Sequence, residues 1–434
     1  MDPGVFFSPE ELAVWSSQRE GFHLLYFTAL GLKLLFLAGC VFTGIGTALG
    51  RAAERMAGWV YRRPSLAAAG RAVPALGGVR RVLERLGRGG SGTAPSHQWL
   101  VDIFYPVLFF ALWAVLILPM DFYANYVHEH AIGLATTSPG LWWSDWFKDL
   151  AMHLVFAGLL GLGLFGLARR LERTWWLWLW GAVVGALLLW SYLSPYRARV
   201  FHQFEALPPG GLASDIGELM DRAGLALERV EVVDTSRRSR SANAYVMGTG
   251  PSRRVVLSDN LVSGFHPREI RVAVAHEVGH ELHEHPARTW LVTAGAALLF
   301  LLLVRLILWR AHRINIFGLR PGADPAILPL VMLVLQLLFL ANNPLSGWLD
   351  RREERQADQE ALRLTNDPVA YCSLMIRLNR LNQVDPRPPP WAVWYFKHHP
   401  TTAERLQTGA RWAKQHAIRL DPAALPLPAP RPPG

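Results

Sequence analysis

The sequence predicts a mainly α-helical, polytopic membrane protein with about six transmembrane helices and a water-exposed domain that contains a small antiparallel β-sheet. Three observations support this prediction. The 434-residue chain is 51% hydrophobic but only 18% charged, whereas soluble domains carry about 25% charged residues. The apolar residues gather in long segments. The longest polar stretch that follows them combines strand-like runs with a motif typical of metal sites.

Six apolar segments approach or exceed the roughly 20 residues that a helix needs to span a bilayer. Any one of them could form a buried helix of a soluble protein, but six in one chain favour membrane spans. Residues 1–195 therefore form an N-terminal transmembrane region of about four helices, interrupted by an Arg-rich loop at 51–97. The segments cover residues 22–49, 100–120, 150–168, 175–194, 289–309 and 326–345.

The formal charge of +10 comes almost entirely from Arg. Many of these residues flank apolar segments, where they anchor and orient helices in a bilayer. Basic residues are not interleaved with aromatic ones in a patch suited to nucleic acid, so we expect the lipid bilayer and no nucleic acid as partner. A composition rich in Arg, Ala, Gly and Pro but poor in Lys is typical of a GC-rich bacterial genome, which predicts the inner (plasma) membrane as location.

Residues 196–287 form the first long polar region. Apolar and β-branched residues alternate or cluster in three short runs, at 230–233, 244–247 and 255–257. Gly and Pro between the second and third runs are typical of a turn. These runs predict a small antiparallel sheet that precedes the metal-binding motif.

The motif is His276-Glu277-Val278-Gly279-His280, within a run that predicts a helix. His276 and His280 are four residues apart, so both imidazoles project from one helical face. Two imidazoles at this spacing can share one Zn²⁺, and Glu277 then lies where it can take a proton from water at the metal. HExxH fixes only three positions, however, and a solvated helix face matches it equally well.

A catalytic zinc takes three protein ligands. Residues 288–345 hold the last two apolar segments as a hairpin, so the segment 346–414 returns to the side of the membrane where 196–287 lies. There Glu354 and Asp358 share one helical face, and Glu354 is the predicted third ligand. Asp358 could then accept a hydrogen bond from a zinc-bound histidine. His283 and His285 stay open as other ligands, but their positions on the helix favour a surface place or a contact behind a ligand. An ordinary charged helix face remains the alternative for Glu354.

These motifs, taken in order, resemble the type I CAAX prenyl endopeptidases and the related HtpX-type membrane proteases, which are gluzincin zinc peptidases. The resemblance covers about residues 100–410. Two departures from the family pattern are Asp350 at a position where the family usually has Ser, and six apolar segments instead of seven. The motifs that carry the resemblance are HEVGH, the hairpin, Glu354-x-Gln356-Ala357-Asp358, His399-Pro400 with Glu404-Arg405, and Asn243-Ala244-Tyr245.

The resemblance implies a gluzincin catalytic domain split into 196–287 and 346–414, one Zn²⁺ per chain, and a peptide or protein substrate that is associated with the membrane. It assigns His276, His280 and Glu354 as zinc ligands and Glu277 as general base and acid. Further implied roles are a stabilising contact from Asp358, oxyanion donation by His399, substrate binding on the edge strand at Asn243, and a pairing of Arg405 with an acidic group or a substrate carbonyl.

Two questions stay open. The loops on the side opposite the protease hold far more Arg than those on its own side, which by the positive-inside rule places the protease outside the cytoplasm. The resemblance implies a cytoplasmic active site, and we follow it. A catalytically silent membrane scaffold or chaperone with the same fold is the alternative function. The sequence does not define the substrate or the oligomeric state, and the Pro-rich residues 415–434 are expected to be disordered.

Overall fold

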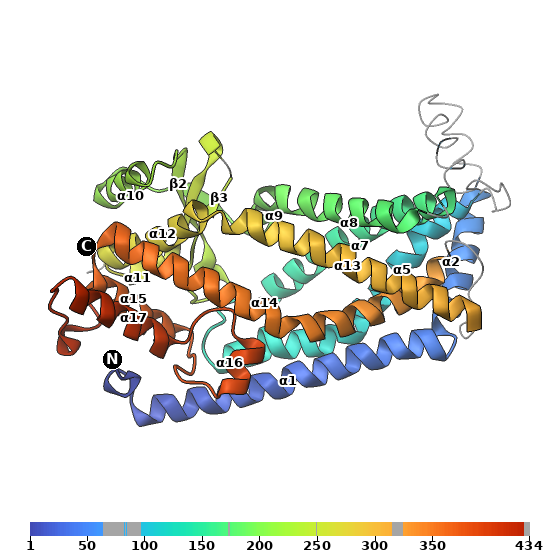
Figure 1. Ribbon diagram of the computed structural model, residues 1–434. Helices are drawn as coiled ribbons and strands as arrows, with labels where there is room; N and C mark the ends of the chain where they lie inside the picture. Colours follow the sequence, from blue (N-terminus) through green and yellow to red (C-terminus); the bar gives the residue numbers. More distant parts are fainter. Residues whose placement is uncertain are drawn as a thin grey trace.

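The computed structural model describes residues 1–63, 82, 84, 97–171, 174–248, 250–314 and 324–428. Long helices run side by side through most of the molecule, and the sheet gathers with shorter helices at one end (Figure 1). The helices are α1 Pro9–Phe42, α2 Ile45–Tyr61, α5 Gln98–Phe122, α6 Glu129–Ala131, α7 Pro139–Arg170, α8 Trp175–Tyr192, α9 Ser194–Phe201, α10 Gly211–Arg222, α11 Asp259–Gly264, α12 Pro267–Leu282, α13 His285–Ile314, α14 Leu328–Thr365, α15 Pro368–Leu381, α16 Pro390–Phe396 and α17 Thr402–Gln415.

Among the described residues, five helical segments are long and apolar enough to cross a membrane: Pro9–Phe42, Gln98–Ala131, Pro139–Arg170, His285–Leu306 and Pro325–Thr365. The sixth predicted span corresponds to a shorter apolar helix, Trp176–Tyr192. Large apolar side chains point outward from these helices; Leu35 and Leu291, for example, are 72% and 74% exposed. Apolar surface on this scale suits contact with lipid instead of water. The predicted polytopic helical fold is confirmed, with a span count close to six.

The first predicted span, 22–49, is interrupted. Helix α1 ends at Phe42, and Gly44 adopts a left-handed conformation with φ of 81°. The chain then turns into α2, which buries Ala53 and Ala57 and runs to Tyr61. The start of the expected 51–97 loop is therefore helical, because small residues let α2 pack closely on its neighbours. Residues 64–96 of this loop, apart from 82 and 84, lie outside the described residues.

The sheet has four strands in the order β1-β2-β4-β3, with bounds Phe204–Ala206, Arg229–Val233, Arg254–Ser258 and Ala244–Met247 respectively. Strands β1 and β2 are antiparallel, as are β3 and β4, but β2 and β4 are parallel. The expectation of a wholly antiparallel sheet is therefore wrong. After β2 the chain passes to the far edge as β3 and returns by a hairpin, so β4 enters the centre in the direction of β2.

The water-exposed end has its own apolar core, formed by the sheet, α10, α12, α15 and α17. The hairpin of α13 and α14 connects its two halves: α12 precedes the hairpin, and the second half of α14 follows it. Both halves meet at this end of the molecule (Figure 1). The core also takes up Phe7 and Trp15 from the start of the chain, which are 2% and 4% exposed.

The described part of the Pro-rich tail, up to residue 428, differs from the disorder expected of it. Leu425 is buried in the core. The Leu427 amide donates to the Ser373 hydroxyl at 2.7 Å, and Arg377 donates to the Leu427 carbonyl. Apolar residues between the prolines give this segment a surface that can pack, which its composition alone obscures. Residues 429–434 lie outside the described part of the chain.

Candidate metal centre

Helix α12 holds the HEVGH motif near its C-terminal end. The helix begins at a capping box formed by His266 and Glu269, with Pro267 in its first turn, a combination that fixes where a helix starts. Val274 and Val278 are buried in the core. This leaves the two histidines on the face that turns toward α14. Their Nε2 atoms lie 3.2 Å apart.

Helix α14 brings Glu354 to the same point. Its Oε2 atom lies 3.3 Å from His276 Nε2, and its Oε1 atom lies 3.4 Å from His280 Nε2. One donor atom from each of the three residues falls within 4.8 Å of the others. The structure thus brings the three predicted ligands together, although two of them precede the apolar hairpin in the sequence and the third follows it.

Gly279 permits this close approach of α12 and α14. A Cβ atom at this position would lie 3.0 Å from the Ala357 Cα and the Glu360 Cβ, and 3.1 Å from the Ala357 carbonyl oxygen. Ala357 itself is fully buried. Two small residues therefore face each other where the helices cross, one turn away from the converging side chains. The sequence contained this signal in the Gly and Ala of the two motifs, but only the helix crossing reveals its meaning.

Asp358 contacts the side of the His276 ring that faces away from Glu354. Its Oδ1 atom lies 3.1 Å from His276 Nδ1, the nitrogen that points away from Glu354. Arg405 on α17 donates from its Nε to Asp358 Oδ2 at 2.9 Å, and a second guanidinium nitrogen donates to Oδ1. Asp358 is 2% exposed. A buried carboxylate between an imidazole and a guanidinium fixes which His276 nitrogen faces the centre.

His280 has an equivalent contact from His285, for which the sequence favoured a surface position or a place behind a ligand. Its Nδ1 atom lies 3.0 Å from His285 Nδ1, and His285 Nε2 lies 3.0 Å from the Gln356 side-chain oxygen. His285 is 2% exposed. His285 therefore lies behind His280 and outside the group of converging donors. His283 also lies outside this group, and its imidazole lies 3.8 Å from Glu360. No periodicity marks His285, because it follows the break between α12 and α13.

Glu277 is half-buried beside the two histidines and forms no hydrogen bond or ion pair with the residues that the structure describes. Burial raises the pKa of its carboxyl group, although the charges of His276 and His280 act in the opposite direction. For His276, burial lowers the pKa, but hydrogen bonds to Asp358 and Glu354 outweigh it and raise the pKa to about 10 in the metal-free protein. The centre therefore strongly favours positive charge.

The remaining predicted site residues lie around this centre. His399 precedes α17, and its Nδ1 atom lies 2.7 Å from Glu354 Oε2, while most of its side chain is exposed. Asn243 is exposed and directly precedes β3 instead of lying within it. Arg405 contacts the acidic group Asp358 and comes within 3.5 Å of His276 Nδ1, so it lies on the same side of the His276 ring as Asp358.

The donor set fits a small divalent cation. Two imidazole nitrogens and a carboxylate oxygen converge within 4.8 Å of one another. Glu354 Oε2 is buried and forms no well-directed hydrogen bond despite the nearby histidines. Two histidines with one carboxylate form a common ligand set of catalytic zinc sites. Contacts from Asp358 and His285 orient the ligand imidazoles, as is usual for metal-bound histidines.

Comparison with known proteins agrees with this geometry. The profile of Peptidase family M48 matches residues 207–413, which include every residue of the centre. The profile described as CAAX prenyl protease N-terminal, five membrane helices, matches residues 72–199. Together the two profiles span the membrane region and both halves of the water-exposed domain.

Two curated relatives and one solved structure are similar over most of the chain. An uncharacterized metalloprotease, YhfN, of Bacillus subtilis is 29% identical over 299 residues, which cover 67% of this chain and 68% of the relative. CAAX prenyl protease 1 of Saccharomyces cerevisiae is 28% identical and covers 67% of each chain. The crystal structure of S. mikatae Ste24p shares the fold, with a TM-score of 0.67, 21% identity, and coverage of 92% of this chain and 99% of that one. This chain is an integral multi-pass membrane protein that belongs to peptidase family M48 and carries the N-terminal membrane region of the CAAX prenyl proteases.

Proposed function

We propose that this protein is a zinc-dependent endopeptidase that hydrolyses peptide bonds of membrane-associated polypeptides. The observation that carries the proposal is the convergence of His276, His280 and Glu354, whose donor atoms lie within 4.8 Å of one another. Glu277 adjoins them with a carboxylate that is not engaged elsewhere among the described residues. Ligands and a free base in one place support hydrolysis instead of a purely structural metal site.

Each side chain has a distinct task in this mechanism. Bound Zn²⁺ would supply a Lewis acid that makes water acidic and polarises the scissile carbonyl. Glu277 accepts the proton from the attacking water and later delivers it to the leaving amine. His399 stands at the exposed side of Glu354, from where it can donate a hydrogen bond to the oxyanion. Asp358, with Arg405 behind it, keeps His276 in the tautomer that presents Nε2 to the centre.

The edge strand β3 supports binding of an extended peptide. It is the last strand of the sheet, so one side of its backbone has no partner strand in the part of the chain that the structure describes. A substrate segment can add there as a further strand, and Asn243 at its start can contact that segment. Helix α13, which is apolar enough to span a membrane, begins at His285, directly after the HEVGH helix. Cleavage is therefore proposed to occur near the bilayer surface.

We place the protein in a bacterial inner membrane with the active site facing the cytoplasm. The resemblance to the family favours this side. The positive-inside rule favours the other side, but it weakens beside a large domain. The prenyl specificity in the names of some relatives is not carried over, because prenyl-CAAX processing is a eukaryotic pathway and the composition indicates a bacterial chain.

Metal analysis with a chelation series tests the proposal. The purified full chain should contain about one zinc per chain and cleave fluorescent casein. We expect 1,10-phenanthroline to abolish cleavage and added Zn²⁺ to restore it. Glu354→Ala should lose both zinc and cleavage. A zinc-loaded wild-type protein that cleaves nothing would favour the alternative, a silent scaffold or chaperone that retains the protease fold.

A further inference from the structure

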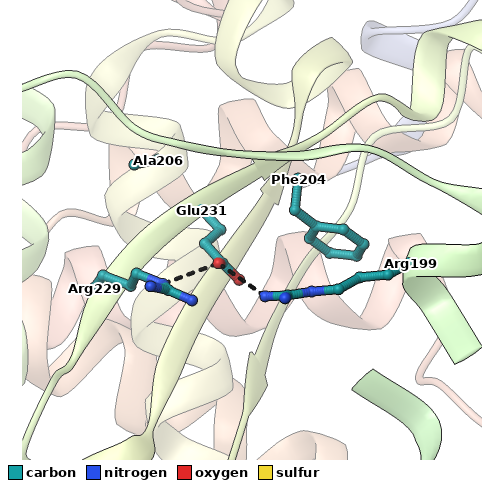
Figure 2. A pocket seen from close by; sticks show the side chains of 5 residues that line it. All are labelled: Arg199, Phe204, Ala206, Arg229 and Glu231. Carbon is teal, nitrogen blue, oxygen red and sulfur yellow. Dashed lines mark ion pairs between the residues drawn. The ribbon is translucent and has the colours of Figure 1, made fainter. Parts of the chain in front are cut away.

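A second concave site lies at the opposite edge of the sheet from β3. Figure 2 shows this pocket, which has a volume of about 330 Å³ and is lined by Arg199, Phe204, Ala206, Arg229 and Glu231. Phe204 and Ala206 come from β1, the other end strand of the sheet. The whole width of the sheet therefore separates this pocket from the strand where substrate is proposed to bind.

Positive charge exceeds negative charge around the pocket. Glu231 is 5% exposed, and the guanidinium groups of Arg229, Arg199 and Arg254 lie 2.9, 3.6 and 3.7 Å from its carboxylate. The second nearby carboxylate, Glu228, is more exposed and pairs with Arg254 at 3.2 Å. Three cations thus share two carboxylates, and only one of these carboxylates faces the pocket.

Arg199 has unused hydrogen-bonding capacity. Its single ionic partner among the described residues is Glu231, at 3.6 Å, which is longer than a hydrogen bond. Half of its side chain is exposed. A guanidinium group offers five N–H donors in a planar fork that matches the oxygens of a carboxylate or phosphate. Arg199 is therefore able to bind an anion that enters the pocket.

The position of Arg199 relative to the membrane indicates which anion. The apolar helix segment Trp176–Tyr192 ends seven residues before it, about 10 Å along a helix. Arg197 stacks on Trp190, with 3.9 Å between the guanidinium carbon and the ring centre. Trp and Arg at the end of an apolar helix are typical of the membrane–water interface. Arg199, which follows this segment, is therefore expected at the depth of lipid headgroups.

Helix α9 and the residue before it also present an apolar stripe beside these arginines. Leu193, Tyr196 and Val200 are 37%, 63% and 48% exposed. Their spacing of three and four residues places them on one helical face. A short helix with an exposed apolar face and basic residues is typical of a segment that lies in the membrane interface. Acyl chains would cover the stripe while a headgroup reaches Arg199.

We propose that this pocket binds the phosphate of an anionic phospholipid, with Arg199 and Arg229 as donors and the apolar stripe of α9 against the acyl chains. A free phosphate would use the two arginines but leave the stripe uncovered. An acidic segment of a protein substrate would have to reach the sheet edge farthest from β3. The combination of cationic pocket, apolar stripe and adjoining membrane helix favours the lipid.

Lipid binding to the full chain in detergent micelles tests this proposal, by native mass spectrometry and by the shift of Tm with added lipid. The probes are phosphatidylglycerol, phosphatidylcholine with the same acyl chains, and inorganic phosphate. Wild-type protein should retain phosphatidylglycerol and gain Tm from it, with weaker effects of the other two. An equal Tm gain from inorganic phosphate alone would overturn the assignment to a lipid.

Three variants make the test specific. Arg199→Gln should weaken phosphatidylglycerol binding about tenfold, the effect of losing one charged hydrogen bond. Glu231→Gln should strengthen it, because it removes the carboxylate that competes with phosphate. Arg222→Gln, at the exposed end of α10, removes the same charge elsewhere and should change nothing. If Arg199→Gln and Arg222→Gln behave alike, or if Arg199→Gln alters only the KM of an acidic peptide, the proposal is wrong.

Discussion

Asp358 Oδ1 lies 3.1 Å from Nδ1 of His276, on the side of the imidazole that faces away from Glu354. His276 lies on α12, which precedes the membrane hairpin in the sequence. Asp358 lies in the second half of α14, which follows the apolar part of the hairpin. Arg405 from a third helix binds the same carboxylate. The orientation of one proposed metal ligand is therefore set by three segments that are distant in the sequence.

Removal of this contact should weaken metal binding without removing a ligand. Asp358→Asn keeps the size of the side chain but loses the charge that holds Nδ1–H of His276. We expect zinc affinity to fall about 10- to 100-fold, measured by competition with a chromophoric chelator. Asp350→Asn is the matched control, since Asp350 lies on the same helix and its one ion pair among the described residues is with the exposed His398. Equal zinc affinities of the two variants would show that Asp358 does not orient His276.

The helix crossing at Gly279 makes a separate prediction. Gly279→Ala inserts a Cβ 3.0 Å from the backbone of Ala357, so α12 and α14 must move apart at the centre. Overpacking of this kind costs about 1–3 kcal/mol, and we expect a lower Tm together with substoichiometric zinc. Gly217→Ala in α10, where a Cβ meets nothing within 4 Å, should keep full zinc and gain slightly in stability. Full zinc occupancy of Gly279→Ala would contradict the role of the close crossing.

Zinc binding should release protons. The pKa of His276 is lowered by burial but raised more strongly by Asp358 and Glu354, to about 10, in the metal-free protein. The charged imidazole of His276 contributes its full share to the free energy of unfolding of the metal-free protein below pH 6.5. This contribution is lost as the pH rises through about 10. Zinc must displace the proton from His276, so its affinity should increase with pH across this window. Calorimetric titration in buffers of different ionisation enthalpy should show release of about one proton at pH 7.5; no proton release would contradict this pKa.

The side of the membrane can be tested by cysteine labelling. Both native cysteines, Cys40 and Cys372, are buried, so a single introduced cysteine reports its own position. Ser252→Cys on the protease side should resist a membrane-impermeant maleimide in intact spheroplasts and react after lysis. Thr174→Cys, between α7 and α8, should react before lysis. The opposite labelling pattern would place the active site outside the cytoplasm.

The metal centre could be predicted from sequence because its geometry is local. The i, i+4 spacing of His276 and His280, and of Glu354 and Asp358, sets each pair on one helical face. The apolar hairpin then requires both faces to lie on one side of the membrane. For His285 the sequence could not choose between a surface position and a place behind a ligand. This residue follows the break between two helices, and its place behind His280 depends on how α13 leaves α12.

The sheet and the first helix were less predictable for a related reason. The parallel pairing of β2 and β4 depends on where β3 is placed, which is a long-range relationship that alternation of residues does not encode. The turn at Gly44 lies inside a continuous apolar run, and hydropathy alone does not reveal it. In both cases the local pattern was compatible with more than one tertiary arrangement.

The most direct test of the central claim is the zinc content and the casein cleavage of Glu277→Gln, measured on the same preparation. Glutamine fills the same space and leaves the three ligands intact, but it cannot accept the proton of the attacking water. We predict about one zinc per chain and a loss of cleavage of at least about 100-fold. Glu281→Gln, one turn later and paired with Arg253 at 3.0 Å, should retain both properties. Cleavage by Glu277→Gln at the wild-type rate would contradict the proposed mechanism.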